Sequence, residues 1–337
     1  MTKNLTDVHG DPALAERVRG VLGDRSPVAV ATVSPGQVRT ATVGAPLDAD
    51  VEIGSISKGI TGMLYVEAID RGEVAPTTRL GDLLPLGDAP AARLTLASLS
   101  THRSGLPRLP TASAPLRRTL ALWRSGANPY GEDLDALVAQ ARQTKVGRPR
   151  SAYSNVGFEL LGHGLAQAAG LPFAALVRTR IADPLGLTSF YLPATASELR
   201  PTALIGSSRG GRAREPWTGE ALGPAGGIRA SIPDLARLIG ALLDGTAPGA
   251  RALDPVGRFS GRIEIGAAWI TLEHKGTTVT WHNGGTGGFR SWLGLDRAAG
   301  TGAAIVSATT RSVDRQGFAL LASLTAGSAG PAERRTA

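Results

Sequence analysis

The chain of 337 residues contains no cysteine, which excludes disulfides, thiolate catalysis and cysteine-based metal sites. Aromatic residues are also scarce, at 4% of the chain. No apolar run reaches the length of a membrane-spanning helix, and the first residues are too polar for a signal peptide. From these absences we expect a cytoplasmic protein with no membrane partner.

Acidic residues are outnumbered by basic ones, and the net charge is +8. The arginines are scattered, however, and the chain has no long basic run, RNA-binding motif or zinc-ligand spacing. A small arginine cluster at residues 209–214 lies in a glycine- and serine-rich stretch typical of a solvated loop. We therefore expect a basic surface that attracts an anionic substrate, no nucleic-acid partner and no cofactor.

Hydrophobic periodicity predicts strands at both ends of the chain and helices in the middle. The expected helices cover residues 11–23, 55–70, 133–142, 156–169, 235–243 and 313–324, and a further helix at 95–107 runs into a Gly-Leu-Pro break. The expected strands are 28–33 and 38–43, joined as a hairpin by Ser-Pro-Gly, and then 263–272, 277–282, 289–295 and 301–307.

This order predicts an α/β (α+β) fold, in which an antiparallel sheet is flanked by helices and interrupted by a mostly helical insertion. The expected sheet domain comprises residues 1–75 and 190–326, and the helical domain comprises residues 76–189. Residues 327–337 are expected to form a disordered tail. A cleft should lie where the two domains meet.

The stretch from Val51 to Tyr65 contains Ser55-Ile-Ser-Lys58 at the start of a predicted helix. Unpaired backbone N–H groups and the positive end of the helix dipole favour an anion at that place. Lys58 lies one turn later on the same face, so the two side chains could act as nucleophile and base. A serine before a helix is also a common N-cap, and this motif alone leaves both interpretations open.

Two later stretches carry polar groups that could join Ser55 and Lys58 in one site. Tyr153-Ser-Asn155 lies on a loop leading into a helix, and His282-Asn-Gly284 ends a strand and is followed by further glycines up to Gly288. Each has an ordinary structural interpretation. Tyr153 could be a half-buried tyrosine, Asn155 a helix cap, His282 a structural residue and the glycines a tight turn.

Taken together, Ser-x-x-Lys, Tyr-x-Asn and His-x-Gly resemble the three motifs of the serine β-lactamase and penicillin-binding-protein superfamily. The class C β-lactamase-like branch is the nearest match, and it includes DD-peptidases, D-aminopeptidases, esterases and transacylases. Further segments at residues 99–107, 183–187 and 223–236 also resemble that branch, so the resemblance covers about residues 28 to 310.

The resemblance implies that Ser55 attacks a carbonyl carbon and becomes acylated. Lys58 and Tyr153 would share the work of the general base, and the sequence leaves open which of them takes the serine proton. The backbone N–H groups of Ser55 and Gly285 would form the oxyanion hole, beside Gly284 in the substrate site. Asn155 would hydrogen-bond Lys58 or the acyl side of the substrate.

His282 departs from the pattern of the branch. β-Lactamases and DD-peptidases commonly place a lysine there, whose charge helps to bind a substrate carboxylate, whereas imidazole is mostly neutral near pH ~7. The change favours the esterase, aminopeptidase and transacylase members, with His282 in a substrate-binding role. The other histidines, His9, His102, His163 and His274, show no partner pattern and are interpreted as structural or surface residues, and no metal site is expected.

The sequence thus predicts a serine hydrolase or acyltransferase that forms an acyl-enzyme from a small-molecule ester or activated amide. A β-lactamase-like esterase is the leading hypothesis. The alternative is a transacylase that passes the acyl group to an amine in natural-product biosynthesis, and a β-lactamase or D-peptidase is less favoured. A catalytically silent binding module is disfavoured, because every motif residue is present. The sequence defines neither the acyl donor nor the oligomeric state.

Overall fold

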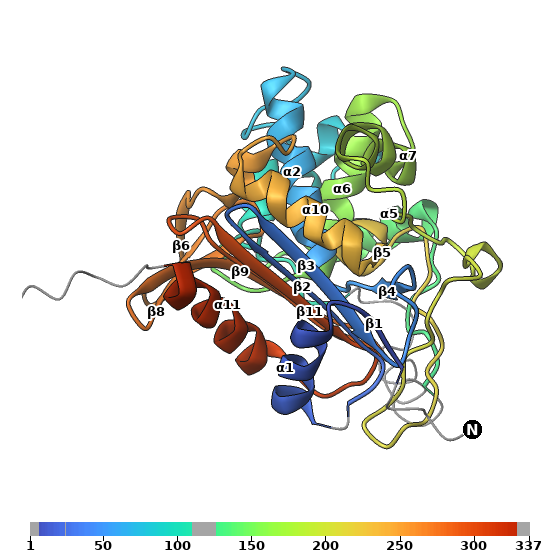
Figure 1. Cartoon of the computed structure of the whole chain (residues 1–337). Helices are drawn as coiled ribbons and strands as arrows, with labels where there is room; N and C mark the ends of the chain where they lie inside the picture. Colours follow the sequence, from blue (N-terminus) through green and yellow to red (C-terminus); the bar gives the residue numbers. More distant parts are fainter. Residues whose placement is uncertain (1–6, 24, 110–125, 329–337) are drawn as a thin grey trace, which may run out of the picture.

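The computed structural model describes residues 7–23, 25–109 and 126–328. Within these residues, nine strands form one sheet in the order β1-β3-β2-β11-β10-β9-β8-β7-β6, and every neighbouring pair is antiparallel. The early and late parts of the chain meet where β2 (Val28–Ser34) pairs with β11 (Thr301–Ser307) (Figure 1).

The remaining elements follow the chain around this sheet. The other strands are β1 (Val8–Gly10), β3 (Gln37–Val43), β6 (Gly257–Ser260), β7 (Ile263–Ile265), β8 (Ile270–His274), β9 (Thr277–Gly285) and β10 (Arg290–Asp296), while β4 (Asp50–Glu52) and β5 (Arg229–Ser231) form a separate antiparallel pair. The helices are α1 (Pro12–Leu22), α2 (Ile56–Asp70), α3 (Leu96–Ser100), α5 (Leu134–Gln143), α6 (Asn155–Ala169), α7 (Phe173–Val177), α8 (Asp183–Leu185), α9 (Gly223–Gly226), α10 (Ile232–Leu243) and α11 (Asp314–Ser328), with short helical turns at Leu80–Asp82, Pro90–Arg93, Arg178–Ala182, Ala196–Glu198 and Ala250–Leu253.

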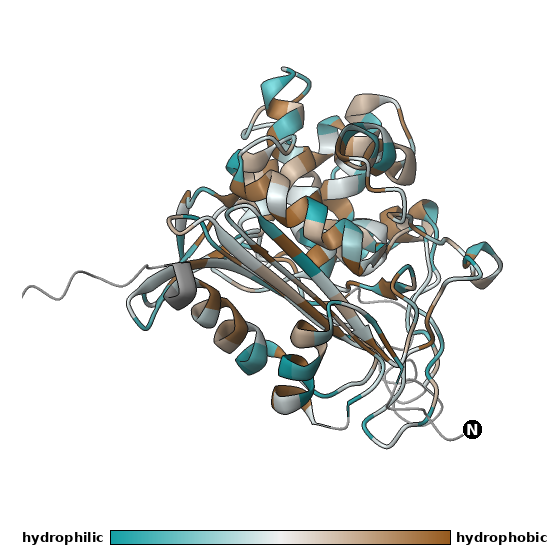
Figure 2. Cartoon of the chain, viewed as in Figure 1, coloured by the Kyte–Doolittle hydropathy of each residue, from teal (hydrophilic) through white to brown (hydrophobic). Residues whose placement is uncertain are grey.

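The sheet has helices on both faces, because alternate residues of its strands point to opposite sides. Val28 and Val30 of β2 belong to a hydrophobic cluster with α1 and α11, whereas Ala29 and Ala31 belong to the larger cluster with α10 and the helical region. Figure 1 shows α1 and α11 on one side of the sheet and α10 on the other. In Figure 2, brown, which marks hydrophobic residues, appears in the strands of the sheet and in the helices packed on it.

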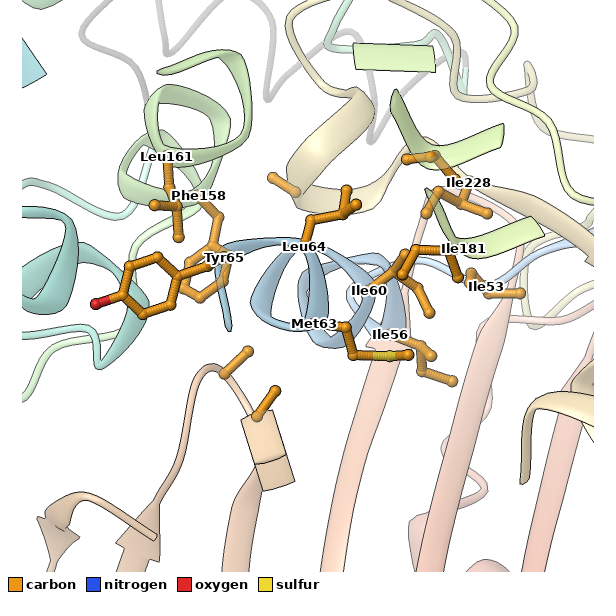
Figure 3. Packing of buried hydrophobic residues seen from close by; sticks show 14 of the residues in the cluster. Ile53, Ile56, Ile60, Met63, Leu64, Tyr65, Phe158, Leu161, Ile181 and Ile228 are labelled. Atoms are coloured by element: carbon orange, nitrogen blue, oxygen red, sulfur yellow. The ribbon is translucent and has the colours of Figure 1, made fainter. Parts of the chain in front are cut away.

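Helix α2 is the core element of the helical region. Apolar side chains leave it in several directions and pack against residues of α6 and of the segments around Ile181 and Ile228 (Figure 3). Ile56, Ile60 and Met63 have no measurable exposure. A helix that is apolar on all sides is stable only when it is surrounded by protein. This surrounding core fixes the position of the helix start, where Ser55 lies.

The structure confirms the predicted fold class and the N-terminal hairpin. Ser34 pairs with Gln37, so Pro35 and Gly36 form a two-residue turn, and Gly36 has a φ of 71°, a conformation that glycine adopts without strain. Helices 11–23, 55–70, 133–142 and 156–169 also form, within a residue or two of the predicted limits. The last helix reaches Ser328, and residues 329–337 of the predicted tail lie outside the described part.

The expected single strand at 263–272 is wrong, because the chain breaks between β7 and β8. Ala268 has a φ of 72°, and its N–H donates to the carbonyl of Ser100 in the helical region. This detour buries Trp269 completely, and its indole Nε1–H donates to the carbonyl of Gly59 in α2 at 3.2 Å. A period-two pattern does not reveal a break that is stabilised by contacts with another part of the chain.

Among the described residues, no single helix is long and apolar enough to cross a membrane, and one bent pair, Asn155–Ala169 with Phe173–Leu185, meets that test only as a pair.

Candidate active site

Ser55 lies on a tight turn between β4 and α2, against the end of β9. Gly54 has a φ of 55°, and a Cβ atom on it would lie 2.8 Å from the backbone nitrogen of Gly285. A Cβ on Gly284 would lie 2.2 Å from the carbonyl oxygen of Ile53 and 2.9 Å from the nitrogen of Ser55. These distances leave no room for a side chain, so the two glycines permit the close approach of β9 to the serine.

The Ser55 hydroxyl does not cap the helix, although the residue holds the N-cap position of α2. Its hydrogen-bond partner is Lys58, whose Nζ lies 3.2 Å from Ser55 Oγ. Ser55 lies at the N-terminus of α2 and on the same face as Lys58, as predicted. The alternative interpretation of its side chain as a helix cap is wrong. A hydroxyl that is not used as a cap is available for chemistry.

Lys58 is completely buried, and α9 holds its amine in place. Nζ donates to the carbonyl oxygen of Ala225 at 2.5 Å, in addition to the contact with Ser55. A buried ammonium needs hydrogen-bond partners to offset the loss of water. The contact with Ala225 aims the amine at Ser55 Oγ, and at this separation a neutral amine could accept the hydroxyl proton.

The end of β9 brings a backbone N–H close to the Ser55 turn. Gly285 is in register with Arg290, while the next residue, Thr286, donates its N–H to Phe289 O. Because hydrogen-bonded and non-bonded pairs alternate in an antiparallel ladder, the Gly285 N–H points away from β10. Among the described residues, β8 pairs with β9 only as far as Trp281. The Gly285 N–H thus faces the Ser55 turn, as the predicted oxyanion hole requires.

Tyr153 lies on the loop before α6, with its ring facing the lysine. The Lys58 Nζ atom is 4.9 Å from the centroid of the Tyr153 ring. Ser154 caps α6, since its hydroxyl oxygen accepts the N–H of Gly157 at 2.9 Å. The predicted grouping of Ser55, Lys58 and Tyr153 is therefore present. The division of base work between Lys58 and Tyr153 stays a prediction.

Asn155 neither caps a helix nor hydrogen-bonds Lys58 in the described part of the chain, although the sequence suggested both possibilities. Its side-chain Nδ2 donates to the hydroxyl of Tyr130 at 3.0 Å, and the partners of Lys58 Nζ in the described part of the chain are Ser55 and Ala225. It is the first residue of α6, and Ser154 is the cap. The Asn155 Oδ1 atom is buried and has no partner among the described residues. The predicted contact with the acyl side of a substrate stays a prediction.

His282 is buried at the end of β9 and is neutral. Its Nδ1–H donates to the carbonyl of Asn283 at 2.7 Å, which places the acceptor lone pair on Nε2. Burial, together with the nearby charge of Lys58, lowers the pKa of His282 to about 4. The imidazole is therefore no substitute for a permanent cation at neutral pH.

Two buried carboxyl groups lie close to the site. Burial raises the pKa of Glu159 in α6 to about 8, although Lys58 acts in the opposite direction, and neither carboxyl oxygen has a partner among the described residues. Burial also raises the pKa of Glu52, just before the Ser55 turn. Arg229, itself completely buried, donates to Glu52 at 3.3 Å and to Asp50 at 2.5 Å. These two ion pairs join β4 to β5 and support the turn.

His102 is a site residue that the sequence interpretation did not identify. Its ring lies 4.5 Å from the Tyr153 ring, centroid to centroid. His102 has no partner pattern in the sequence. The segment at residues 99–107, which contains this histidine and resembles a motif of the same branch, is the sequence feature that indicates a role near the site.

Comparison with known proteins tests the resemblance. A family model described as Beta-lactamase matches residues 14–326. The chain belongs to the beta-lactamase family. It is 33% identical over 149 residues to the Escherichia coli (strain K12) D-alanyl-D-alanine-carboxypeptidase/endopeptidase AmpH, a match that covers 42% of this chain and 36% of AmpH. It is 27% identical over 331 residues to penicillin-binding protein 4 of Amycolatopsis lactamdurans, covering 89% of this chain and 78% of the relative.

The beta-lactamase fold extends over nearly the whole chain. A solved class C beta-lactamase superposes with a TM-score of 0.78 at 17% identity, covering 95% of this chain and 96% of the other. An identity this low establishes the fold alone. The match to AmpH spans only about a third of that relative's length, so it does not establish the activity of the whole protein.

Proposed function

We propose that this chain is an esterase that forms a covalent acyl-enzyme on Ser55. The observation that carries the proposal is the contact of 3.2 Å between Lys58 Nζ and Ser55 Oγ, close to the backbone N–H of Gly285 at the end of β9. Serine hydrolases need this combination of an activated hydroxyl and backbone donors for the oxyanion.

In the proposed reaction, Ser55 Oγ forms a bond to the acyl carbon while its proton passes to the Lys58–Tyr153 pair. The N–H groups of Ser55 and Gly285 stabilise the negative charge on the carbonyl oxygen. The bond from the acyl carbon to the leaving oxygen then breaks, and that oxygen takes up the proton. Water attacks the acyl-enzyme in the second half, releases the acid and restores the Ser55 hydroxyl.

The neutral state of His282 supports an ester over a substrate with a carboxylate next to the reacting bond. A pKa of about 4 leaves the imidazole uncharged at neutral pH. A substrate carboxylate would then lie beside a neutral ring where a lysine would supply a charge-assisted hydrogen bond. An uncharged ester does not need that cation.

A D-alanyl carboxypeptidase is the second candidate, favoured by the similarity to AmpH. It uses the same nucleophile, so only the preferred acyl donor distinguishes it from an esterase. A transacylase, the third possibility, differs only in the acceptor that reaches the acyl-enzyme.

The test is a comparison of kcat/KM for an aryl ester of a short acid, a D-alanyl-D-alanine peptide and a cephalosporin. The esterase proposal predicts that the aryl ester is preferred by at least about 10-fold, the factor that corresponds to one charge-assisted hydrogen bond. Preference for the peptide would establish the carboxypeptidase instead. Adding a primary amine to the ester reaction separates the third possibility, since amide formation at the expense of free acid marks a transacylase.

A further inference from the structure

His102 lies in the loop after α3, in a conformation that its surroundings impose. Its φ is 55°, which is uncommon for a residue with a side chain, and only 2% of its surface is exposed. The ring contacts two aromatic rings, with centroids 4.5 Å from Tyr153 and 4.7 Å from Phe158. Strained backbone of this kind persists only where several contacts fix it.

The same residue also holds the backbone on both sides of Tyr153. The N–H of Ala152 donates to the carbonyl of His102 at 2.9 Å, and the N–H of Ser154 donates to its Nδ1 at 3.2 Å. Because Nδ1 accepts a hydrogen bond, the ring proton lies on Nε2. Nε2 is buried and has no partner among the described residues.

The imidazole must stay uncharged in this position. Burial, the charge of Lys58 on α2 and His282 on β9 all lower the pKa of His102. A proton on Nδ1 would remove the acceptor for the Ser154 N–H and add a cation close to Lys58. The neutral ring is therefore the form that is compatible with the observed hydrogen bonds.

We propose that His102 is a positioning residue that holds the Tyr153 ring against Lys58, by a tilted ring contact and by hydrogen bonds from the backbone N–H groups of Ala152 and Ser154. This role rests on the proposed function of Tyr153 in acyl transfer. It acts through geometry, since the lysine amine lies 4.9 Å from the Tyr153 ring centroid and a small displacement of the ring would break that alignment.

A double-mutant cycle with the aryl ester tests the proposal. His102→Ala is expected to lower kcat/KM by about 10- to 100-fold, mostly through kcat, as misplacement of a catalytic group does. In a Tyr153→Phe background the same change should have almost no effect, because the hydroxyl that it positions is absent. Equal losses in both backgrounds, or no loss in either, would overturn the proposal. His102→Asn keeps an acceptor for the Ser154 N–H and tolerates positive φ, so it should recover part of the activity.

A second measurement does not depend on turnover. Fluorotyrosine labelling, with the Tyr153 resonance assigned from the Tyr153→Phe variant, should give a ¹⁹F signal that shifts or broadens in His102→Ala. His274→Ala is the matched control, because it removes a histidine ring that stacks on Phe318 at 4.9 Å. A Tyr153 signal unchanged by His102→Ala contradicts the positioning role, even if no ester is turned over. An absence of turnover combined with a shifted signal contradicts the proposed function alone.

Discussion

At the scale of single residues, the lowered pKa of His282 leads to a prediction about substrate choice. His282→Lys would place an ammonium group where burial and Lys58 now keep an imidazole neutral. The ratio of kcat/KM for a D-alanyl peptide to that for an aryl ester is expected to rise by about 10-fold, the equivalent of one charge-assisted hydrogen bond. Steady-state kinetics on both substrates measure it, with His274→Lys as the control. An unchanged or lower ratio would show that this position does not select against carboxylates.

The burial of Glu159, another single residue, leads to a prediction about the pH dependence of stability. Its pKa is raised from 4.5 to about 8 by burial, so the folded chain keeps a proton that the unfolded chain releases in that range. The stability associated with the neutral carboxyl is therefore fully present below pH 4.5 and is lost as the pH rises through about 8. A shift of this size corresponds to at most about 5 kcal/mol.

Glu159→Gln removes this dependence, because the amide is neutral at every pH. Urea unfolding at about pH 5 and about pH 9 should show the variant gaining stability over the parent chain by several kcal/mol at the higher pH. Glu16→Gln, whose parent side chain is 80% exposed, should show no such gain. Parallel pH dependence of the parent chain and the Glu159 variant would mean that Glu159 is ionised in the folded chain.

At the scale of elements, the contact between β9 and the start of α2 decides whether the site forms. Gly284→Ala would place a methyl group 2.2 Å from Ile53 O, so β9 must move away from Ser55 and take the Gly285 N–H with it. We expect a loss of about 100-fold or more in kcat, typical of a lost oxyanion donor, and a lower Tm. Initial rates and thermal melts measure both effects.

Gly257 in β6 provides the matched strand control. A Cβ on Gly257 meets nothing within 4 Å, so Gly257→Ala should leave both kcat and Tm close to those of the parent chain. Full activity in Gly284→Ala would contradict the assignment of the Gly285 N–H to the oxyanion hole. A loss of Tm without a loss of kcat would assign Gly284 to the fold and not to the site.

At the scale of the whole molecule, local patterns predicted the elements whose side chains face a single environment. The period-two hairpin from Val28 to Val43 and the helix from Ile56 to Asp70 both formed as expected. Where contacts between distant parts of the chain determine the local structure, the same patterns did not predict it. Trp269 interrupts a predicted strand because its indole reaches Gly59, and the short strand at Arg229 forms through ion pairs with Asp50 and Glu52.

In the candidate site, too, the sequence predicted contacts between nearby residues and not those between distant segments. Ser55 and Lys58 are one helical turn apart, so their contact could be predicted from spacing. Asn155 and Tyr130 are brought together by tertiary structure, and no local pattern links them. The buried state of Glu159 and the contact of His102 with Tyr153 likewise depend on packing between separate segments. Sequence motifs therefore indicated the proposed nucleophile, whereas the contacts that position the residues around it could be seen only in the structure.

The most direct test of Ser55 as the nucleophile is the intact mass of the protein seconds after it is mixed with an activated aryl ester. The parent chain should gain the mass of one acyl group, and Ser55→Ala should gain none. Ser57→Ala removes a neighbouring hydroxyl that accepts the Ile228 N–H, and should still be acylated. An adduct of equal yield on Ser55→Ala, or ester turnover that persists in that variant, would contradict acyl transfer through Ser55.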